Sequence, residues 1–175
     1  EQEANLLYIA VTTDTGCFQY ANTNAATLRA AARLLELGAD NRKISMDFFR
    51  KISRARMALV GQIYSGMRFF RGGQVAIAVV TRALIDSVHA TEDDCDDIAG
   101  LPGRAEGAVV SVTIRELLDG RSKISVRSNP EVDACAICAV YGGGGHKMAS
   151  GCTLACDTET AVEKILAAID QVWPA

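Results

Sequence analysis

Four consecutive glycines, residues 142 to 145, place the strongest constraint on how this chain can fold. An ordered glycine costs roughly 0.5–1 kcal/mol of backbone entropy relative to alanine. A folded run of them therefore uses what only glycine offers, which is positive φ and close approach of another group to the backbone. Successive N–H groups can then converge into a concave nest that suits an oxyanion. His146 and Lys147 follow directly, and a helix beginning near His146 would add its positive N-terminal end.

This glycine-rich segment predicts a pocket for a phosphate or a terminal phosphoryl group. It contains neither GxxxxGK followed by Ser or Thr, nor a GxGxxG that opens a long helix after a strand. A flexible turn between two elements is the alternative, because glycine clusters mark turns as well as phosphate sites. The residues predicted to contact the phosphate are Gly143, Gly144, Gly145 and His146.

The composition is that of a globular protein, with 49% of the 175 residues apolar and 22% charged. This length suits one sizeable domain or two small ones. The net charge is −3, so any site for a polyanion must be a local basic patch. No apolar run approaches the ~20 residues that span a bilayer, so we expect a cytoplasmic protein without a membrane partner. The chain opens on Glu1 rather than Met, which suggests a trimmed or truncated product.

Six cysteines stand at positions 17, 95, 135, 138, 152 and 156. The last four have the spacing CxxC, thirteen residues, CxxxC, which resembles a zinc site. The first pair, however, lies in the apolar run DACAICAVY, without the glycine or polar turn that usually shapes a zinc knuckle. Free cysteine is also among the most buried residue types. We therefore favour a reduced cytosolic protein and keep a zinc-stabilised domain as an alternative.

The first apolar run, NLLYIAV at residues 5–11, predicts a strand buried on both faces, as in a parallel sheet. Such a strand needs neighbours and crossover helices, so we expect the chain to begin late in a domain. Asp14, in TTDTG, would then lie at the carboxyl end of this strand, where open α/β sheets bind ligands. Asp14 is thus a candidate metal ligand or general base. A simple turn before Gly16 is the alternative.

Helical patterns fill the segment that follows. Asn24 is predicted to cap an amphipathic helix that Gly38 ends, with Leu28 and Leu35 on its apolar stripe. A second, longer helix is predicted from Asp40 or Ser45 to about Phe70, as a connector that meets a domain boundary at two glycines. The predicted divisions are a C-terminal remnant of a catalytic domain at 1–43, a linker helix at 44–71 and a second domain at 72–175.

Residues 107–128 predict a β-hairpin around Asp119-Gly120. A three-residue loop, Asp119 to Arg121, keeps one face of the hairpin apolar, whereas a two-residue loop would mix the faces. The other face then gathers Ser111, Thr113, Arg115, Ser125 and Arg127. Arg115 and Arg127 are candidates to grip a phosphate or to stack on a base, and a solvated sheet face is the alternative. Glu116 is expected to pair with Arg121 or Lys123.

The remaining patterns complete an α/β fold. Residues 74–81 predict a strand, 131–141 a helix, 152–156 a short strand and 158–172 a closing amphipathic helix. The fold class expected is the C-terminal piece of a parallel-sheet catalytic domain, a connecting helix, and then a mixed-sheet α/β domain.

Three motifs resemble DHH-family phosphoesterases and stand in that family's order. GGGGHKMASG is similar to the signature of the DHH-associated domain, the family's C-terminal module. YIAVTTDTGCFQYANTNAATLRAAARLLELGAD resembles the end of the catalytic DHH domain, and VTIRELLDGRSKISVRS resembles the substrate-binding hairpin. The similarity covers nearly the whole chain. It is closest to bacterial oligoribonucleases, nucleotide 3′-phosphatases and cyclic-dinucleotide phosphodiesterases.

This resemblance implies a two-lobed enzyme whose catalytic lobe binds two manganese ions (Mn²⁺) through Asp and His residues. Asp14 would be a manganese ligand and catalytic residue by motif position. The second lobe would bind the substrate, a phosphorylated nucleotide or short single-stranded oligonucleotide. Arg115, Arg127 and Ser128 would hold nucleotide or phosphate, and the glycine run with His146 would contact the phosphate near the metals.

The Asp-His-His triplet that names the family is absent from this sequence, as are its other early metal motifs. We therefore expect a C-terminal piece that is inactive alone, binds no manganese by itself, and has the N-terminal catalytic lobe as its partner. The alternatives are a non-catalytic module that binds nucleotides or single-stranded nucleic acid, and an exopolyphosphatase or pyrophosphatase of the same superfamily. The sequence leaves the oligomeric state open, a homodimer included.

Overall fold

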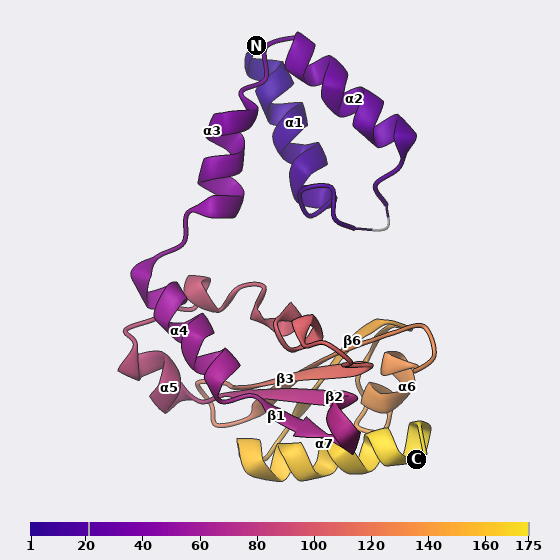
Figure 1. The fold of residues 1–175 in the computed structure, drawn as a ribbon. Coiled ribbons are helices and arrows are strands. Elements are labelled where there is room, and N and C mark those ends of the chain that lie inside the picture. The colour runs from indigo at the N-terminus through magenta and orange to yellow at the C-terminus, as the bar shows by residue number, and fades with distance from the viewer. Residues whose placement is uncertain (21, 175) are drawn as a thin grey trace. The chain divides into compact units, whose positions relative to one another are not determined.

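The computed structural model describes residues 1–20 and 22–174, which form two compact units, Glu1–Ile52 and Ser53–Ala175. The first unit is helical, and the second contains a six-stranded mixed sheet with helices (Figure 1). The predicted α/β fold class is thus confirmed. Within the described ranges, every helix is too short or too polar to span a bilayer.

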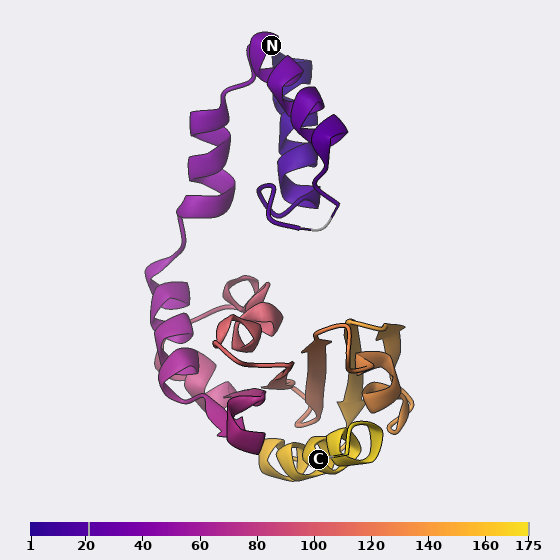
Figure 2. The same cartoon turned by 45° about the vertical axis from the view of Figure 1, so that its right-hand side comes forward.

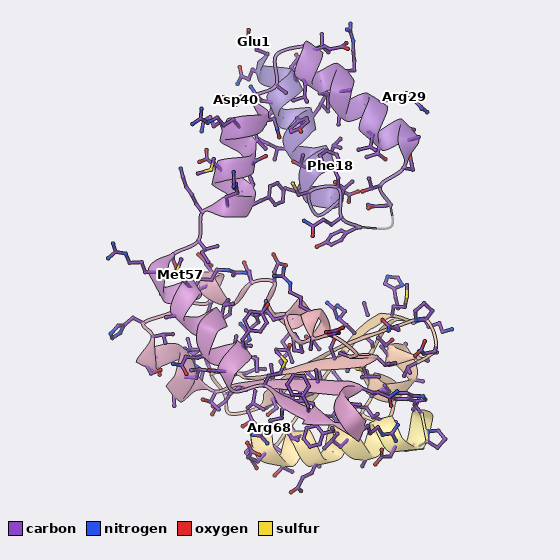
Figure 3. All side chains as sticks on the ribbon, viewed as in Figure 1. Glu1, Phe18, Arg29, Asp40, Met57 and Arg68 are labelled. Carbon is purple, nitrogen blue, oxygen red and sulfur yellow. The ribbon has the colours of Figure 1, made fainter. Side chains whose placement is uncertain are left out.

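The first unit contains helices α1 (Gln2–Asp14), α2 (Ala25–Glu36) and α3 (Asn41–Ser45), followed by a π-helical turn at Met46–Arg50. Its small core joins one buried residue from each helix, namely Tyr8, Ala31 and Ile44. Phe18, labelled in Figure 3, packs its ring edge-on against Tyr8 with 6.4 Å between the ring centroids. This core is what holds the three helices together.

The strand predicted over residues 5–11 is wrong, because this segment lies within α1. A short apolar run fits a buried helix as well as a buried strand. Burial here follows helical spacing, since Ala4, Tyr8 and Thr12 are buried at every fourth position. Leu6 and Leu7, which a two-faced strand would bury, are 62% and 57% exposed. The parallel sheet expected in this part of the chain is therefore not found among the described residues.

Helix α2 begins as predicted, because the Asn24 side chain accepts hydrogen bonds from the backbone N–H groups of Ala26 and Thr27. Just beyond its end, Gly38 adopts a φ of 93°, which suits glycine. The predicted apolar stripe is only partly buried. Ala31 lies in the core, whereas Leu28 and Leu35 are exposed.

The single connecting helix predicted up to Phe70 is wrong, because the chain leaves helical geometry at residues 51–53. A new helix, α4 (Arg54–Ser65), begins where the Ser53 hydroxyl accepts a hydrogen bond from the Arg56 N–H at 2.9 Å. The following residues form a short strand, β1 (Arg68–Phe70). The compact units divide between Ile52 and Ser53, so α4 and β1 pack with the second unit rather than linking two domains.

The sheet of the second unit has the strand order β1-β2-β3-β4-β6-β5. Strands β2 (Val75–Val80) and β3 (Val110–Glu116) are parallel, and every other neighbouring pair is antiparallel. The remaining strands are β4 (Ser122–Ser128), β5 (Gly144–His146) and β6 (Ala149–Leu154). The strands predicted at 74–81 and 152–156 are therefore present, but the second begins three residues earlier and ends two residues earlier than predicted.

Each face of this sheet has its own core. Helices α6 (Ala134–Ala139) and α7 (Thr158–Val172) cover one face, and Figures 1 and 2 show α7 along it. Helix α4, helix α5 (Arg82–Ser87) and 3₁₀ turns between residues 93 and 104 cover part of the other face. At the sheet edge, Arg68 of β1, labelled in Figure 3, forms an ion pair with Glu159 of α7. The helix predicted at 158–172 is confirmed, and the helix predicted at 131–141 is present but shorter, at Ala134–Ala139.

The hairpin of β3 and β4 has the predicted faces, because Val112 pairs with Val126 and Thr113 with Ser125. Its three-residue loop is one position earlier than predicted, Leu118–Gly120, with Leu117 N–H bonded to Arg121 O at 2.8 Å. Gly120 takes the positive φ that closes such a loop. The register shift of two residues leaves each side chain on its predicted face.

The predicted pairing of Glu116 with Arg121 or Lys123 is wrong. The Glu116 carboxylate instead accepts a hydrogen bond from the backbone N–H of Arg82 at 2.9 Å, at the start of α5. A carboxylate is favourable there because the first N–H groups of a helix lack partners.

Candidate functional site

The candidate site is built from two cross-strand rows on the sheet face that points away from α6 and α7. Directly paired residues on antiparallel strands place their side chains on the same face. The first row contains, in order across the sheet, His146, Ala149, Arg127 and Ser111. The second row contains Gly144, Gly151, Ser125 and Thr113.

The inner end of both rows is covered. The Ser111 and Thr113 side chains are buried, and the Thr113 hydroxyl donates to the carbonyl oxygens of Ile98 and Ala99 at 3.4 Å each. Gly103 packs so closely that a Cβ there would lie 3.1 Å from the Ser111 hydroxyl oxygen. Of the polar face predicted from the hairpin, Ser111 is therefore covered, and the hydroxyl of Thr113 is already hydrogen-bonded within the protein.

The outer end of the rows forms an open floor of small residues. Ala149 lies between Arg127 and His146, Gly151 and Gly144 lie beside it in the second row, and both flanking side chains reach solvent. Arg127 and His146 are two strand spacings apart, or about 10 Å. Arg127 donates to the carbonyl oxygen of Val126 at 3.0 Å and forms no ion pair with any described residue, so its charge is not compensated.

Ala149 and Gly151 were not recognised as site residues from the sequence. Their signal is the alternation Ala-Ser-Gly at 149–151 on a strand, which places two small side chains on one face and Ser150 on the other. Without the pairing partners, small residues in a strand indicate close packing as readily as a binding surface.

The structure does not bring Arg115 together with Arg127. They belong to different rows, since Arg115 pairs with Lys123 and Arg127 with Ser111, four residues along β3. This places the two Cα positions about 13 Å or more apart. The Arg115 guanidinium is also held by Glu92, with 3.1 Å between Nη1 and the carboxylate oxygen. The two arginines therefore lie at separate places on this face, and a contact of either one with a phosphate or a base stays a prediction.

The glycine run ends a helix and then forms an edge strand, so the helix expected near His146 is absent. The N–H groups of Gly142 and Gly143 donate to the carbonyl oxygens of Ala139 and Cys138 at 3.0 Å each, which closes α6. These two donors are not available for the expected anion nest. The remaining glycines, Gly144 and Gly145, pair with β6 as strand β5.

Two of the predicted phosphate residues are glycine for reasons of packing. A Cβ on Gly143 would collide with the carbonyl oxygen of Gly151 and would lie 2.5 Å from Cys152 Cβ. Gly145 has a φ of 151°, and a Cβ there would lie 2.6 Å from the carbonyl oxygen of Ala149. At Gly144 a Cβ would meet open space and φ is not positive. Gly144 is thus the glycine of the run that the fold itself leaves free to vary.

Ser128 stabilises the backbone around the site through its hydrogen bonds. Its hydroxyl donates to the carbonyl oxygen of Val132 at 2.7 Å and lies 3.4 Å from that of Lys147. The Lys147 carbonyl also accepts the N–H of Ala134 at 2.7 Å. These bonds tie the end of β4 to the β5–β6 turn that carries His146. A direct contact of Ser128 with a nucleotide stays a prediction.

Asp14 is the last residue of α1, in the first unit, and not at the end of a strand. Its carboxylate accepts a hydrogen bond from the Asn22 side chain at 3.0 Å. Within the described ranges, no three His, Cys, Asp or Glu side chains come together as a metal-binding group. The manganese role of Asp14 therefore stays a prediction from the motif.

Comparison with known proteins decides the family. The model of the DHHA1 domain matches residues 72–173. The bifunctional oligoribonuclease and PAP phosphatase NrnA of Thermus thermophilus is 40% identical over 91% of this chain and 47% of its own length. This chain belongs to the DHH phosphoesterase family. It carries the family's C-terminal DHHA1 domain.

Two further proteins are similar to this chain. The crystal structure of an exopolyphosphatase-related protein from Bacteroides fragilis superposes with a TM-score of 0.87 at 26% identity, covering 96% of this chain and 49% of that one. An A-adding tRNA nucleotidyltransferase of Geobacter sulfurreducens is 30% identical over 98% of this chain and 19% of its own length. The chain thus spans about half the length of the phosphatase relatives and less of the transferase.

The DHHA1 domain contains the open floor with Arg127 and His146, whereas Asp14 lies outside the matched residues.

All six cysteines are free thiols, and the four late ones form no metal-binding group within the described ranges. Cys138 and Cys152 are instead a buried pair between α6 and β6. A hydrogen bond from Cys152 lowers the pKa of Cys138 to about 7, and the same bond together with burial raises the pKa of Cys152. The geometry therefore does not support the zinc alternative.

Proposed function

We propose that this chain is the substrate-binding part of a manganese-dependent phosphoesterase that hydrolyses short oligonucleotides or small phosphorylated nucleotides. The observation that carries the proposal is the row in which Arg127 and His146 flank Ala149 on an open sheet face. The names of the relatives, an oligoribonuclease and phosphatase among them, point to the same class of substrate.

The chemistry of the floor suits a phosphorylated nucleotide. A guanidinium presents a planar fork of N–H donors that matches two phosphate oxygens, so Arg127 would carry the main charge contact. His146 would donate to a further oxygen from the opposite side. The absence of large side chains at Gly144, Ala149 and Gly151 would let a ribose or a base lie directly on the backbone. The Ser125 hydroxyl is available at the edge of this floor for a polar contact.

The manganese requirement belongs to the whole protein in this proposal. A two-metal centre needs several carboxylate and imidazole ligands around ions about 3.5–4 Å apart. The described residues bring no three such side chains together, so they do not make up that centre, and Asp14 would supply at most one ligand. We therefore assign no step of the hydrolysis to a metal within this chain. Its own residues would bind and orient the substrate.

Calorimetric titration with 5′-AMP in metal-free buffer tests the proposal. We expect Arg127→Ala and His146→Ala each to weaken binding, by about tenfold for the arginine because a charge-assisted contact is lost. Arg121→Ala, which removes an exposed arginine at the tip of the same hairpin, is the matched control and should bind as the parent chain does. Unchanged affinity in Arg127→Ala would refute the assignment of the floor.

A second candidate function is a non-catalytic nucleotide or single-stranded RNA binding module. It is favoured by the similarity to an A-adding tRNA nucleotidyltransferase, in which a matching segment occupies a small part of a larger protein. Both candidates predict binding at the same floor. Manganese-dependent release of nucleotide from a short oligoribonucleotide by the whole protein separates them, because only the phosphoesterase should turn the substrate over.

A further inference from the structure

A cavity of about 150 Å³ lies beside the open floor, on the same face of the sheet. Its sheet wall is formed by Thr113, Arg115, Lys123 and Ser125, and its opposite wall by residues 95–99. Ser125 belongs both to this cavity and to the second row of the floor. The cavity and the floor are therefore continuous along β4.

Resting on the proposed function, we infer that this cavity is a second subsite, which receives the next nucleoside of a dinucleotide while Lys123 binds the phosphate that joins the two nucleosides. The chain would accordingly prefer substrates of two or more nucleotides over a single nucleotide. Neither Lys123 nor the residues 95–99 entered the site through the sequence motifs.

The spacing along β4 supports two linked units. Side chains on one face of a strand repeat every two residues, or about 7 Å. The Cα atoms of Lys123 and Arg127 are therefore about 14 Å apart, with Ser125 midway. The two cations are therefore far enough apart to bind different phosphates. An extended dinucleotide, which carries a phosphate on each nucleoside, can contact one with each phosphate.

The charges at the rim of the cavity differ from those inside it, so the two places suit different parts of a nucleotide. Lys123 is exposed at the rim and forms no ion pair with the residues described here, so it can follow a phosphate. Inside the cavity, the carboxylates of Asp96 and Asp97 would repel a phosphate but can accept hydrogen bonds from base N–H or ribose hydroxyl groups. The interior therefore suits a neutral polar group, and the rim suits an anion.

Arg115 fits the wall of a nucleoside pocket better than a phosphate clamp. Its guanidinium is fixed by Glu92, which in turn pairs with Arg82, so part of its charge is already compensated. A guanidinium held in place offers a flat surface on which a base can stack. Burial raises the pKa of the neighbouring Cys95, so that thiol stays neutral at this wall.

Calorimetry of the full 175-residue chain with two probes, 5′-AMP and 5′-phosphorylated diadenylate, tests the inference in metal-free buffer at one ionic strength. We expect the diadenylate to bind about tenfold more tightly than 5′-AMP. Lys123→Gln removes the rim charge, and Ala99→Leu fills the cavity without changing any charge. Each should reduce the advantage of the diadenylate to about twofold and leave the affinity for 5′-AMP unchanged.

Lys164→Gln, on the exposed side of α7, is the control for the loss of one positive charge and should keep the full advantage. The salt dependence gives a second readout, because each phosphate contact to a single strand contributes a slope of about −0.7 in log K against log salt. Lys123→Gln should make the slope for the diadenylate shallower by about that amount.

Equal affinities for the two probes in the parent chain would overturn the second subsite and leave the proposed function standing. An advantage that survives both Lys123→Gln and Ala99→Leu, or that disappears in Lys164→Gln, would also overturn it. In those cases the cavity is a water-filled gap between the 3₁₀ turns and the sheet. Binding of neither probe would contradict the proposed function together with the inference.

Discussion

At the scale of single residues, the glycine run shows most clearly that one sequence motif can reflect packing as well as ligand binding. The sequence correctly indicated that the run needs glycine, but packing explains Gly143 and Gly145 without any ligand. Local sequence cannot show this, because the colliding groups, Gly151 and Cys152, belong to the next strand. The same holds for Arg115, whose partner Glu92 lies in a segment that no hairpin pattern connects with it.

Alanine substitutions within this run separate folding from binding. Gly143→Ala should lower the free energy of unfolding by about 1–3 kcal/mol, because the new Cβ meets backbone carbonyl oxygens and the Cβ of Cys152. Gly144→Ala is the matched control, since its Cβ meets open space and should leave stability nearly unchanged. Urea denaturation of the three proteins measures both values. Equal stability of Gly143→Ala and the parent chain would show that the close approach at Gly143 is not present in solution.

At the scale of elements, the alternation of side chains along the strands was the most informative signal in the sequence. The alternation in residues 110–128 predicted which side chains share a face, and this survived a register shift of two residues. The segment 5–11 failed because a seven-residue apolar run has no period that distinguishes a strand from a buried helix. The long connecting helix failed because Ser53, a helix-capping residue inside the pattern, begins a separate helix there.

Ser53 also connects two elements that cover the sheet. Its hydroxyl donates to the Asp94 carboxylate, which in addition accepts the backbone N–H of Thr91 at 2.9 Å. The hydrogen bond from Ser53, followed by those from Thr91, lowers the pKa of Asp94. Because the folded protein favours the charged carboxylate, this contribution is present above the unfolded pKa of about 3.9 and is lost as the pH falls through the folded value.

Asp94→Asn should therefore be less stable than the parent chain at pH 7, and the difference should shrink as the pH falls below about 4. Asp93→Asn, at the neighbouring exposed carboxylate, is the control and should track the parent chain at both pH values. Denaturant unfolding at pH 7 and pH 3 provides the measurement. A difference between Asp94→Asn and the parent chain that is independent of pH would exclude the carboxylate as its cause.

At the scale of the whole molecule, the motifs predicted the family and the mixed sheet, and the comparisons bear both out. The chemistry of hydrolysis does not follow from this chain, because Asp14 is an isolated carboxylate at the end of α1 in the part of the chain described here. A sequence motif can mark such a residue. The described residues, however, bring no second and third ligand next to Asp14.

For the whole protein we predict that Asp14→Ala lowers kcat strongly, by roughly a hundredfold or more, and reduces bound manganese, while KM changes little. Arg127→Ala should instead mainly raise KM, since it removes binding that ground state and transition state share. Steady-state kinetics with a short oligoribonucleotide, together with elemental analysis, separates the two. Wild-type turnover and metal content in Asp14→Ala would remove Asp14 from the metal centre. The 175-residue chain alone should show no manganese-dependent turnover.

The central claim is that the open floor between Arg127 and His146 binds a phosphorylated nucleotide, and an NMR titration of the ¹⁵N-labelled chain with 5′-AMP tests it most directly. The account predicts that the amide shifts that change most belong to the floor and its flanking residues, namely Ser125, Arg127, Gly144, His146, Ala149 and Gly151. Saturable shifts centred elsewhere, for example on the helical unit of residues 1–52, would contradict it, as would a spectrum that does not change.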